Sequence, residues 1–392
     1  MHSLFSRLTL AGGLLAGLLL SLPAAAQQQP AAASQKKDKA TVTAPADGTP
    51  LRDSSARDTE RKVLAALARK KVWDGPTTGP KAQPGKTVIF IAADMKNGGI
   101  VGVSKGVEEA TKAIGWQLRI LDGQGSVQGR TAAMNQALTV KPDGIVLGGF
   151  DAEEQATALR EAARNKVPVV GWHAGREATG NNGLFYNVTT KAQDVADIAA
   201  LYAVMESKGK AGVVIFTDSA YSVAIAKSDA MAEVIRNCKG CTLLGIEDTP
   251  LADTSKRMPG LTAALLQKYG DKWTHSLGIN DLYFDFMGPT LAAAGTAGKR
   301  LVNLSGGDGS ESAYARIRKS QFQAGTVPEP LNLHGWQAVD ELNRAIAGQP
   351  PSGYMTPVHL VTPQTIVFDG GPKNSFDPDN GYREAYKKIW KK

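Results

Sequence analysis

The sequence has few of the residues that bind metals or carry redox chemistry. It contains only two cysteines and five histidines in 392 residues. The histidines are scattered, and none has the spacing that places metal ligands together on one helix. They are His2, His173, His275, His334 and His359. The two cysteines would supply only half of a zinc site, so we expect no metal ion and no cofactor.

Recognisable catalytic motifs are also missing. The segment Gly295–Arg300 contains glycines and a lysine, but it lacks the spacing and the Ser or Thr of a phosphate-binding loop. Gly123, Gly125 and Gly129 approach the dinucleotide-binding fingerprint, but their spacing is one residue too long and they follow the second expected strand. No serine lies in a Gly-x-Ser-x-Gly elbow, and no pair of carboxylates is marked by its spacing as acid and base. The sequence therefore predicts a protein that is not an enzyme.

The two cysteines form a Cys-x-x-Cys motif, Cys238 and Cys241. A redox motif of this kind normally opens a helix, whose N-terminus stabilises the thiolate. Here the pair follows the helix-like segment Ala226–Arg236 and precedes the strand-like segment Thr242–Ile246. In an oxidising compartment a disulfide is the default, so we favour a structural disulfide over a redox pair. Because the loop is very small, the chain-entropy model assigns it about 2 kcal/mol or less.

Long apolar runs are absent after Leu20. Arg7 precedes the apolar run Leu8–Leu20, and the small residues Ala24–Ala26 follow it. This order is typical of a secretory signal peptide, so we expect residues 1–26 to be removed by cleavage near Ala26. An uncleaved membrane anchor is the alternative, but the run is too short to cross a bilayer comfortably. Because no cysteine lies directly after the cleavage region, we expect an exported protein that is not a lipoprotein.

Dense clusters of basic charge are missing, although the net charge is +8. A dense basic run lies at the C-terminus, at Lys387, Lys388, Lys391 and Lys392. Combined with an export signal, such thinly spread charge indicates a solvated basic surface. We therefore expect no nucleic-acid partner.

Residues 27–85 are rich in Ala, Gln, Pro, Lys and Thr and contain few residues to bury. This composition predicts a low-complexity leader that is disordered or loosely docked. The segment Asp58–Lys71 is the exception, because Val63, Leu64 and Leu67 fall on one face of a possible helix. A helix this short needs to dock on the main body to be stable.

The folded part of the chain opens with a strand–helix–strand unit between Lys86 and Gln124. Thr87–Ala93 is a short apolar run of the kind that forms a buried parallel strand. Apolar residues then recur at helical spacing over Val101–Ile114, and Trp116–Leu121 is the next apolar run. We interpret this order as a right-handed parallel βαβ unit. Ligands of such units bind past the carboxyl ends of the strands, which here means Asp94–Gly99.

Strands and helices alternate after this unit, and the pattern restarts at Ala211–Thr217, roughly 125 residues after the first strand. Two similar parallel α/β domains are the simplest explanation. We expect the chain to recross between them near Val327–Pro330 and again near Pro351–Pro357. Several such crossovers would form a hinge.

These expectations fix the domain bounds and the elements of the tail. The N-terminal domain is expected to comprise residues 86–188 with 329–350, and the C-terminal domain residues 189–328 with 351–392. In the tail we expect strands at Pro357–Val361 and Thr365–Phe368 and a last helix at Gly381–Trp390.

Polar and aromatic side chains gather at the expected carboxyl ends of the strands. Such a mixture of carboxylates, amides and rings binds a small polar molecule by hydrogen bonds and stacking. Two positions have a second interpretation: Asp151 suits a helix N-cap better than a ligand contact, and Trp172 fits the domain core equally well. The residues that we expect to bind ligand are Asp94, Asn97, Trp172, His173, Asp218, Tyr221, Asn280 and Asp308.

Several stretches between Lys86 and about Ile346 carry a family resemblance. They are VIFIAADMKNGGIVGVSKGVEEATKAIGW, LDGQGSVQGRTAAMNQALTVKPDGIVLGGFDAEE, VPVVGWH, GIND and LVNLSGGDGS. They resemble the type I periplasmic solute-binding proteins, the ribose-binding and LacI-related family served by ABC importers. The resemblance implies an α/β fold of two Rossmann-like domains joined by a three-segment hinge. It also implies a sugar-like ligand held in the cleft by residues from both domains.

The first half of the chain keeps only part of the family's sugar-binding pattern. Asn97 stands at the family's Asn, but Gly98–Ile100 replace the Pro and the aromatic rings that follow it. His173 and Ala174 replace an Asp-Arg pair. The bidentate arginine contact that is lost is among the stronger polar contacts available to a ligand, so the resemblance argues against ribose.

The second half keeps more of the pattern. Asn280–Asp281 and Asp308 match the family's residues. An arginine that often lies early in the first helix of the second domain falls on either Ile225 or Lys227. The hinge glutamine of the family falls near Pro328–Glu329.

The resemblance implies an extracytoplasmic solute-binding protein of an ABC importer, a monomer that delivers its ligand to a permease complex in the inner membrane. Domain closure would accompany binding. A periplasmic sensor that presents ligand to a membrane receptor or kinase has the same features and stays open as the alternative. A LacI-type repressor would need a helix-turn-helix where this chain has the expected signal peptide. An exported enzyme would need a catalytic constellation, so both are weaker hypotheses.

Overall fold

Two parallel sheets of five strands organise the computed structural model, which describes residues 54–391. The strand orders are β2-β1-β3-β4-β5 and β10-β9-β8-β6-β7, and all neighbouring strands are parallel. The strands are β1 Thr87–Ala92, β2 Gln117–Asp122, β3 Gly144–Gly148, β4 Val169–Trp172, β5 Tyr186–Val188, β6 Gly212–Thr217, β7 Thr242–Asp248, β8 His275–Gly278, β9 Val302–Ser305 and β10 Gly325–Thr326. The predicted fold class, α/β with two Rossmann-like halves, is confirmed.

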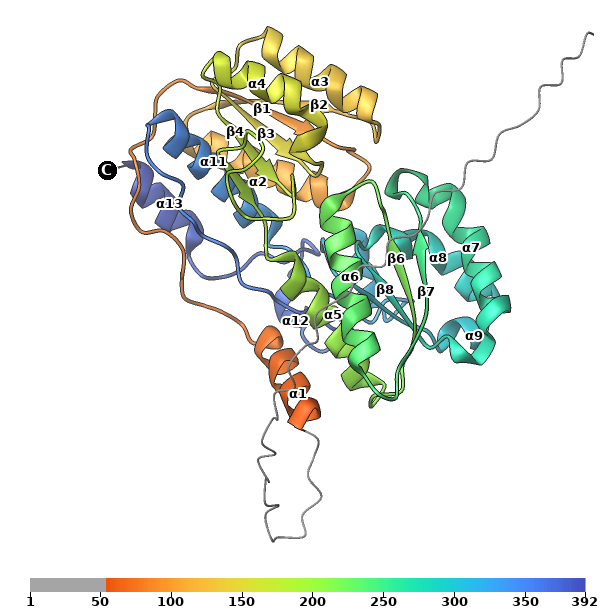
Figure 1. Cartoon of the computed structure of the whole chain (residues 1–392). Helices are drawn as coiled ribbons and strands as arrows, with labels where there is room; N and C mark the ends of the chain where they lie inside the picture. Colours follow the sequence, from red (N-terminus) through yellow and green to blue (C-terminus); the bar gives the residue numbers. More distant parts are fainter. Residues whose placement is uncertain (1–53, 392) are drawn as a thin grey trace, which may run out of the picture. The chain divides into compact units, whose positions relative to one another are not determined.

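Helices connect the strands and cover the sheets (Figure 1). The α-helices are α1 Ser54–Leu67, α2 Gly98–Ile114, α3 Val127–Thr139, α4 Ala156–Arg164, α5 Ala192–Glu206, α6 Ser222–Asn237, α7 Thr254–Tyr269, α8 Leu282–Ala293, α9 Thr296–Lys299, α10 Glu311–Arg318, α11 Leu331–Ile346, α12 Ile366–Asp369 and α13 Tyr382–Lys391. Short 3₁₀ segments are η1 Ala152–Gln155, η2 Leu251–Asp253 and η3 Gly270–Lys272. No helix among these is long and apolar enough to cross a membrane.

Burial explains the sequences of the central strands. β6 reads GVVIFT and is buried along its whole length, while β1, TVIFIA, is buried from its second residue onward. Each lies between two parallel neighbours and is covered by helices on both faces, so it carries apolar residues without alternation. The edge strands β2 and β7 instead contain only exposed and half-buried residues.

Two apolar cores define two lobes. The first lobe comprises the β1–β5 sheet with α2–α4, α11 and α13, and the second comprises the β6–β10 sheet with α5–α10 and α1. Between β1 and α12 the chain crosses between the lobes after β5, between β10 and α11, and again after α11. The last two of these crossings lie where the sequence predicted recrossing. The chain also passes from the second lobe to the first between α1 and β1 and between α12 and α13. All described residues fall within one compact unit.

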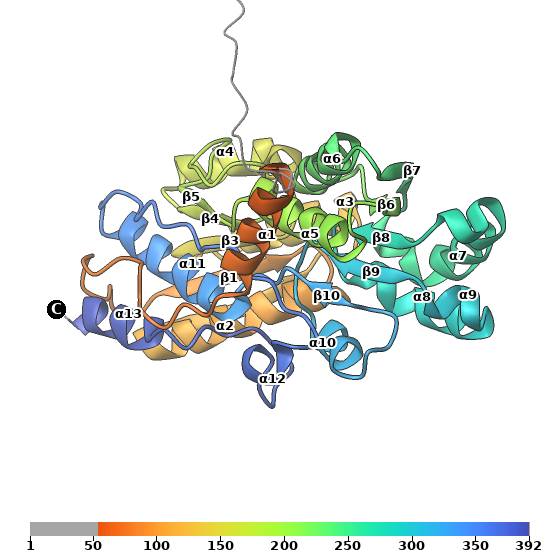
Figure 2. The ribbon, with the colours of Figure 1, turned by 90° about the horizontal axis from the view of Figure 1, so that it is seen from below.

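Helices α2 and α11 lie side by side beneath the first sheet (Figure 2). A Cβ atom on Gly106 would lie 2.7 Å from the Cα of Asn332, and one on Gly335 would lie 2.3 Å from the backbone carbon of Gly106. The two backbones therefore approach so closely that only glycine fits at the contact. This packing attaches α11 to the first lobe. Helix α11 begins directly after a crossing.

The first and last helices of the described residues attach to opposite lobes. The predicted short helix forms as α1 and packs against α5, with Val63 fully buried and Leu64 exposed. At the other end, α13 joins the first core through Tyr382, Tyr386 and Trp390. The sequence-based bounds placed residues 351–392 in the second domain, so for α13 the assignment is wrong. Residues 1–53, which include the expected signal peptide, lie outside the described range.

The two strands predicted in the tail do not form. Val361 makes only an isolated antiparallel bridge to Thr326, and Ile366–Asp369 form α12. The backbone N–H of Thr362 donates to the hydroxyl of Thr365, which turns the chain before another ladder bond can form. The predicted last helix is present as α13.

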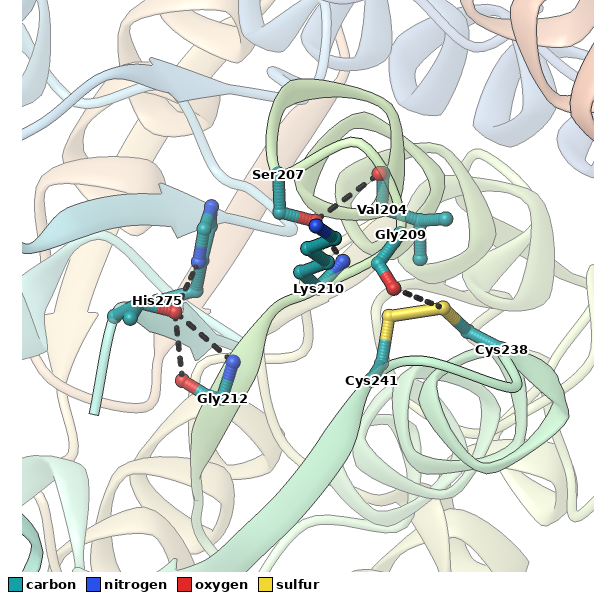
Figure 3. Close-up of a disulfide and its surroundings, with 9 residues drawn as sticks. Val204, Ser207, Gly209, Lys210, Gly212, Cys238, Cys241 and His275 are labelled. Carbon is teal, nitrogen blue, oxygen red and sulfur yellow. Dashed lines mark hydrogen bonds between the residues drawn. A yellow bond between two sulfur atoms is a disulfide. The ribbon is translucent and has the colours of Figure 1, made fainter. Parts of the chain in front are cut away.

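The predicted disulfide joins Cys238 and Cys241 (Figure 3). It lies between the end of α6 and the start of β7, as the sequence indicated. The pair does not open a helix, so it lacks the helix N-terminus that lowers a thiol pKa in redox motifs. No free cysteine remains in residues 54–391.

Candidate functional site

A cavity of about 130 Å³ lies at the carboxyl ends of the two sheets, between the lobes. The first lobe lines it with Ala93, Asp94, Lys96, Asn97, Ile100, Gly125, Gly149, Trp172 and His173. The second lobe lines it with Tyr221, Val223, Ala224, Lys227, Leu251, Ala252, Thr254, Ser255, Ile279, Asn280, Leu282, Phe286 and Asp308. This volume is below the range of about 300–1,000 Å³ for drug-sized ligands, so the cavity suits a compact molecule.

All of the residues predicted to bind ligand line this cavity except Asp218. The carboxylate of Asp218 accepts hydrogen bonds from the backbone N–H groups of Ala220 and Leu251 at 2.9 and 2.8 Å. Its side chain therefore ties the loop after β6 to the start of η2. Burial raises the pKa of Asp218, and the two backbone bonds oppose that rise. Its place in the structure supports a loop-holding role instead of a ligand contact.

Asn97 caps helix α2 at the edge of the cavity. Its Oδ1 atom accepts hydrogen bonds from the backbone N–H groups of Gly99 and Ile100 at 2.8 and 3.4 Å, the geometry of an N-cap. Its amide Nδ2 makes no hydrogen bond within residues 54–391 and remains available as a donor. The sequence predicted Asn97 as a ligand contact but did not predict the cap.

The glycines after Asn97 let the two lobes approach each other. A Cβ on Gly99 would lie 2.2 Å from Asp308 Oδ2, and one on Gly98 would lie 2.7 Å from Ser310 Cβ. Both neighbours belong to the second lobe. These contacts show that the first turn of α2 packs against the opposite lobe.

The loop after β9 places Asp308 at the cavity, and hydrogen bonds with neighbouring side chains hold the loop in place. Asp308 Oδ2 accepts a hydrogen bond from Asn280 Nδ2 at 2.7 Å. The neighbouring carboxylate of Asp281 accepts from the backbone N–H of Gly309 and from Gln323 Nε2, both at 2.7 Å. Burial raises the pKa of both carboxyl groups. Asp281 thus orients the loop, while Asp308 faces the ligand space.

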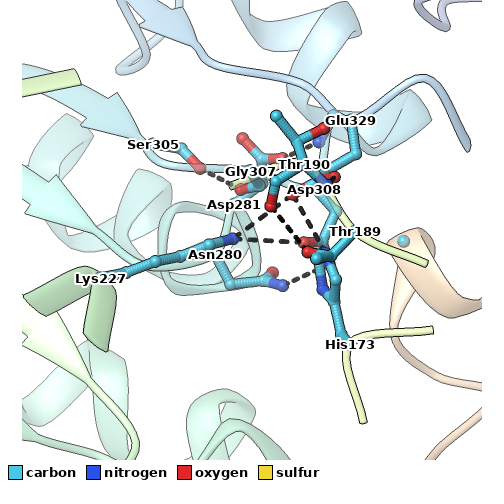
Figure 4. A network of polar contacts seen from close by, with 12 residues as sticks. His173, Thr189, Thr190, Lys227, Asn280, Asp281, Ser305, Gly307, Asp308 and Glu329 are labelled. Carbon is cyan, nitrogen blue, oxygen red and sulfur yellow. Dashed lines mark hydrogen bonds and ion pairs between the residues drawn. The ribbon is translucent and has the colours of Figure 1, made fainter. Parts of the chain in front are cut away.

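A buried group of charges closes the hinge end of the cavity (Figure 4). Lys227 Nζ lies 4.0 Å from Asp308 Oδ1 and 3.8 Å from Glu329 Oε1. His173 Nε2 lies 3.1 Å from the same Glu329 oxygen, without the geometry of a hydrogen bond. Lys227 was one of two alternatives for the family's arginine, and the other, Ile225, does not line the cavity. Burial would raise the pKa of Glu329, but His173, His334 and Lys227 together lower it below its usual value.

A chain of hydrogen bonds connects this charge group to the crossings between the lobes. Trp172 Nε1 donates to His334 Nδ1 at 3.1 Å, and His334 Nε2 lies 2.7 Å from Thr356 Oγ1. Thr356 contacts Thr190 Oγ1 at 2.7 Å, and the backbone N–H of Thr190 donates to Glu329 at 3.2 Å. Thr190, Glu329 and Thr356 each lie on a different crossing. The network therefore couples these three crossings to the wall of the cavity.

The protonation state of His334 follows from its surroundings. Burial lowers the pKa of His334 to about 4, so the ring is neutral at neutral pH. Because Nδ1 accepts from Trp172, the proton is on Nε2, which donates to Thr356. Sequence inspection missed both His334 and Glu329. Only the near-match of Glu329 to the family's hinge glutamine indicated either of them.

Trp172 belongs to the core more than to the ligand surface. Its ring is 1% exposed and stacks on His173, with centroids 4.2 Å apart and planes 10° apart. His173 has a left-handed backbone (φ 51°), which turns the chain at the end of β4. Of the two predicted stacking rings, Tyr221 is the more accessible. Phe286, on the second turn of α8, is a half-buried ring at the cavity that the sequence did not single out.

Residues 54–391 contain no group of three or more His, Cys, Asp or Glu side chains that could hold a metal ion. The donors and acceptors of the cavity suit hydrogen bonding to an organic ligand.

Comparison with known families agrees with this geometry. A family model described as a periplasmic binding protein domain matches residues 88–350. The chain belongs to this family. The resemblance inferred from the sequence is therefore confirmed, and the family is one of periplasmic proteins that bind solutes. A search of curated proteins finds no match.

Solved structures share the fold of this periplasmic binding protein. A galactofuranose-binding protein is 20% identical with a TM-score of 0.63, covering 71% of this chain and 95% of its own. A solute-binding protein from Agrobacterium vitis with bound alpha-D-tagatopyranose is 15% identical with a TM-score of 0.66, covering 74% and 99%. A chain of the XylFII–LytSN complex is 14% identical with a TM-score of 0.61, covering 71% and 98%. At these identities the similarity establishes the fold alone.

Proposed function

We propose that this periplasmic binding protein captures a small, neutral, polyhydroxylated ligand, sugar or sugar-like, for an ABC importer. The observation that carries the proposal is the cavity at the carboxyl ends of both sheets, which residues of both lobes line. A ligand held there contacts both lobes at once, so it binds best when the lobes are closed. Sugar-binding proteins of ABC transporters among the similar structures support the same function.

The polar groups of the cavity suit a ligand that both donates and accepts hydrogen bonds. Asn97 Nδ2 is free to donate, and Lys227 Nζ has no partner closer than 3.8 Å. Asp308 Oδ1 is available to accept, because only the other oxygen of this carboxylate is bonded to Asn280. Hydroxyl groups fill both roles, which is why a polyol or sugar fits this site.

The charges of the hinge end favour a neutral ligand over an acidic one. Lys227 already lies about equally close to two carboxylates, Asp308 and Glu329. A ligand carboxylate placed at this ammonium group would face both negative charges in a buried environment, where screening is weak. We therefore expect sugars and polyols to bind better than the corresponding sugar acids.

We further propose that the protein acts as a monomer and delivers its ligand to a permease complex in the inner membrane. Export would depend on the signal peptide expected in residues 1–26, with cleavage near Ala26. No step of this function requires a catalytic group or a cofactor from the chain.

A thermal-shift screen over sugars, polyols, nucleosides and small aromatic acids tests the proposal. A neutral polyhydroxylated ligand at 100 times its Kd should stabilise the protein by about 2.7 kcal/mol. Asp308→Ala and Asn97→Ala should abolish the shift, and Asp271→Ala, an exposed substitution in η3, serves as the control. Stabilisation by aromatic acids alone would contradict the ligand class. Unchanged binding in both cavity variants would contradict the site.

A periplasmic sensor is the second candidate. One similar structure is a complex with another protein, XylFII–LytSN, so this fold also occurs with a protein partner. Uptake of the identified ligand by a strain that lacks this protein separates the two functions. Lost uptake supports import, whereas normal uptake with lost transcriptional induction supports a sensor.

A further inference from the structure

Asp151 occupies the N-cap position of η1 but does not cap it. Its backbone has the extended conformation of an N-cap (φ −65°, ψ 129°), yet its side chain makes no hydrogen bond to the N–H groups that follow. The sequence interpretation of Asp151 as the cap of its own helix is therefore wrong.

The carboxylate of Asp151 bonds to the opposite lobe. Oδ2 accepts from the backbone N–H of Ser222 at 2.9 Å, and Oδ1 accepts from the hydroxyl of Ser222 at 2.8 Å. Ser222 is the first residue of α6, and the N-cap residue of that helix, Tyr221, provides no side-chain cap. Asp151 thus supplies both a hydrogen-bond acceptor and a negative charge to the N-terminus of α6.

We infer that Asp151 is a positioning residue, which biases the two lobes toward the closed form by capping α6 across the cleft. Tyr221 and Val223 flank Ser222, and Lys227 follows on the same helix, so the bond fixes the part of α6 that lines the cavity. Asp151 itself does not line that cavity. Its effect on ligand affinity rests on the function proposed above, whereas its effect on closure does not.

The geometry also makes the contact reversible. When the lobes separate, the Ser222 groups and the Asp151 carboxylate bond to water instead. The contact therefore biases the equilibrium without locking the lobes.

The inference can be tested without knowing the ligand, by measuring the distance between the lobes in ligand-free protein. Cysteines introduced at the exposed residues Glu161 and Glu233 carry nitroxide labels on α4 and α6. No native free thiol among the described residues competes for the label. Double electron–electron resonance then reports the ratio of closed to open molecules in each variant.

We expect Asp151→Ala to lower the closed-to-open ratio about tenfold, the scale of a hydrogen bond to a charged group. Asp151→Asn keeps an acceptor and should lower it less, and Ser222→Ala should lose only the hydroxyl bond. Glu153→Ala is the matched control, because Glu153 lies two residues away and bonds to Asn182 of its own lobe. The Tm of the variants should stay close to that of the wild type. A variant that had lost structure in general would have a lower Tm.

Two results would overturn the inference. One is a distance distribution that is the same in the wild type and Asp151→Ala, including the case in which both are fully open. The other is an equal shift in Glu153→Ala. A failed ligand screen would leave these measurements unaffected, so the proposed function and this inference can fail separately.

Discussion

Charged side chains lie both at the hinge end of the cavity and in the outer cross-lobe contacts, which are the contacts that join the two lobes at the protein surface. They are buried at the hinge end and exposed in the outer contacts. At the hinge end, the side chains of Lys227 and Glu329 are 3% and 0% exposed. Among the outer contacts, Lys105 of α2 pairs with Glu311 of α10 at 2.9 Å, and these side chains are 59% and 66% exposed. The Asp151–Ser222 contact is half-buried and lies between these extremes.

This difference shows that burial, more than pairing, determines how much free energy is lost when a charge loses its partner. A buried charge that loses its partner cannot be solvated, so breaking a buried pair costs several kcal/mol. An exposed pair that separates is hydrated at once and costs about 0–1 kcal/mol. The hinge end should therefore determine stability and the shape of the cavity. The outer contacts should only adjust the balance between open and closed forms.

Removal of Glu329 should give the largest effect. Glu329→Ala leaves Lys227 and His173 without this carboxylate in a buried environment, so we expect a loss of about 3–5 kcal/mol in the free energy of unfolding. Urea denaturation measures it. Glu329→Gln keeps an acceptor for the backbone N–H of Thr190 and should lose less. The contrast between the two regions breaks down if Glu311→Ala destabilises the protein as much.

The pH dependence of stability should reveal a second buried carboxyl on the first lobe. Burial raises the pKa of Glu341 to about 7, although the N–H and hydroxyl of Ser352 bond to it. In the unfolded chain the ordinary value is 4.5. The stabilisation is therefore fully present below pH 4.5 and is lost as the pH rises to 7, by at most about 3 kcal/mol.

Glu341→Gln cannot ionise and should show a flatter profile over this window. Urea midpoints at pH 5 and pH 7.5 in the wild type and the variant give the comparison. Glu384→Gln, with a side chain that is 79% exposed, should keep the wild-type profile. Parallel profiles for wild type and Glu341→Gln would show that burial does not raise the pKa of Glu341.

The alternation of apolar strands and amphipathic helices was sufficient to predict the fold and the edge of the sheets where the cavity lies. Asn97 and Asp308 could be placed at that edge because each lies in a loop that follows a strand. The roles of Asp151 and Asp218 could not be predicted, because a loop carboxylate reveals its partner only in the tertiary structure. Asp151 and Ser222 are 71 residues apart, and Trp172 and His334 are 162 apart. Such pairs depend on how the lobes meet, which local spacing does not encode.

A substitution at Gly99 should change the closure of the lobes without changing the stability of the protein. In the closed arrangement a Cβ at this position would lie 2.2 Å from Asp308 Oδ2, a distance that real contacts do not reach. Gly99→Ala should therefore oppose closure, with at least about a tenfold loss of ligand affinity and a matching fall in the closed fraction. The Tm should change little, because alanine suits a helix. Gly260→Ala, where no atom lies within 4 Å of the added Cβ, is the control. Unchanged affinity and closure in Gly99→Ala would mean that the lobes meet differently in solution.

The smallest effect is expected for Lys105→Ala, which removes the exposed pair with Glu311. Because each side chain is more than half exposed, the pair should contribute at most about 1 kcal/mol, a change of less than about fivefold in the closed-to-open ratio. At 1 M salt, where the Debye length is about 3 Å, the difference from wild type should disappear. The same measurement on Asp151→Ala should retain most of its effect, because that contact is half-buried and its bonds are to a helix end. If Lys105→Ala instead shifted the ratio as much as Asp151→Ala, solvent exposure would not determine how strongly each contact affects closure. Closure would then depend on long-range attraction between the lobes, not on the specific capping of α6.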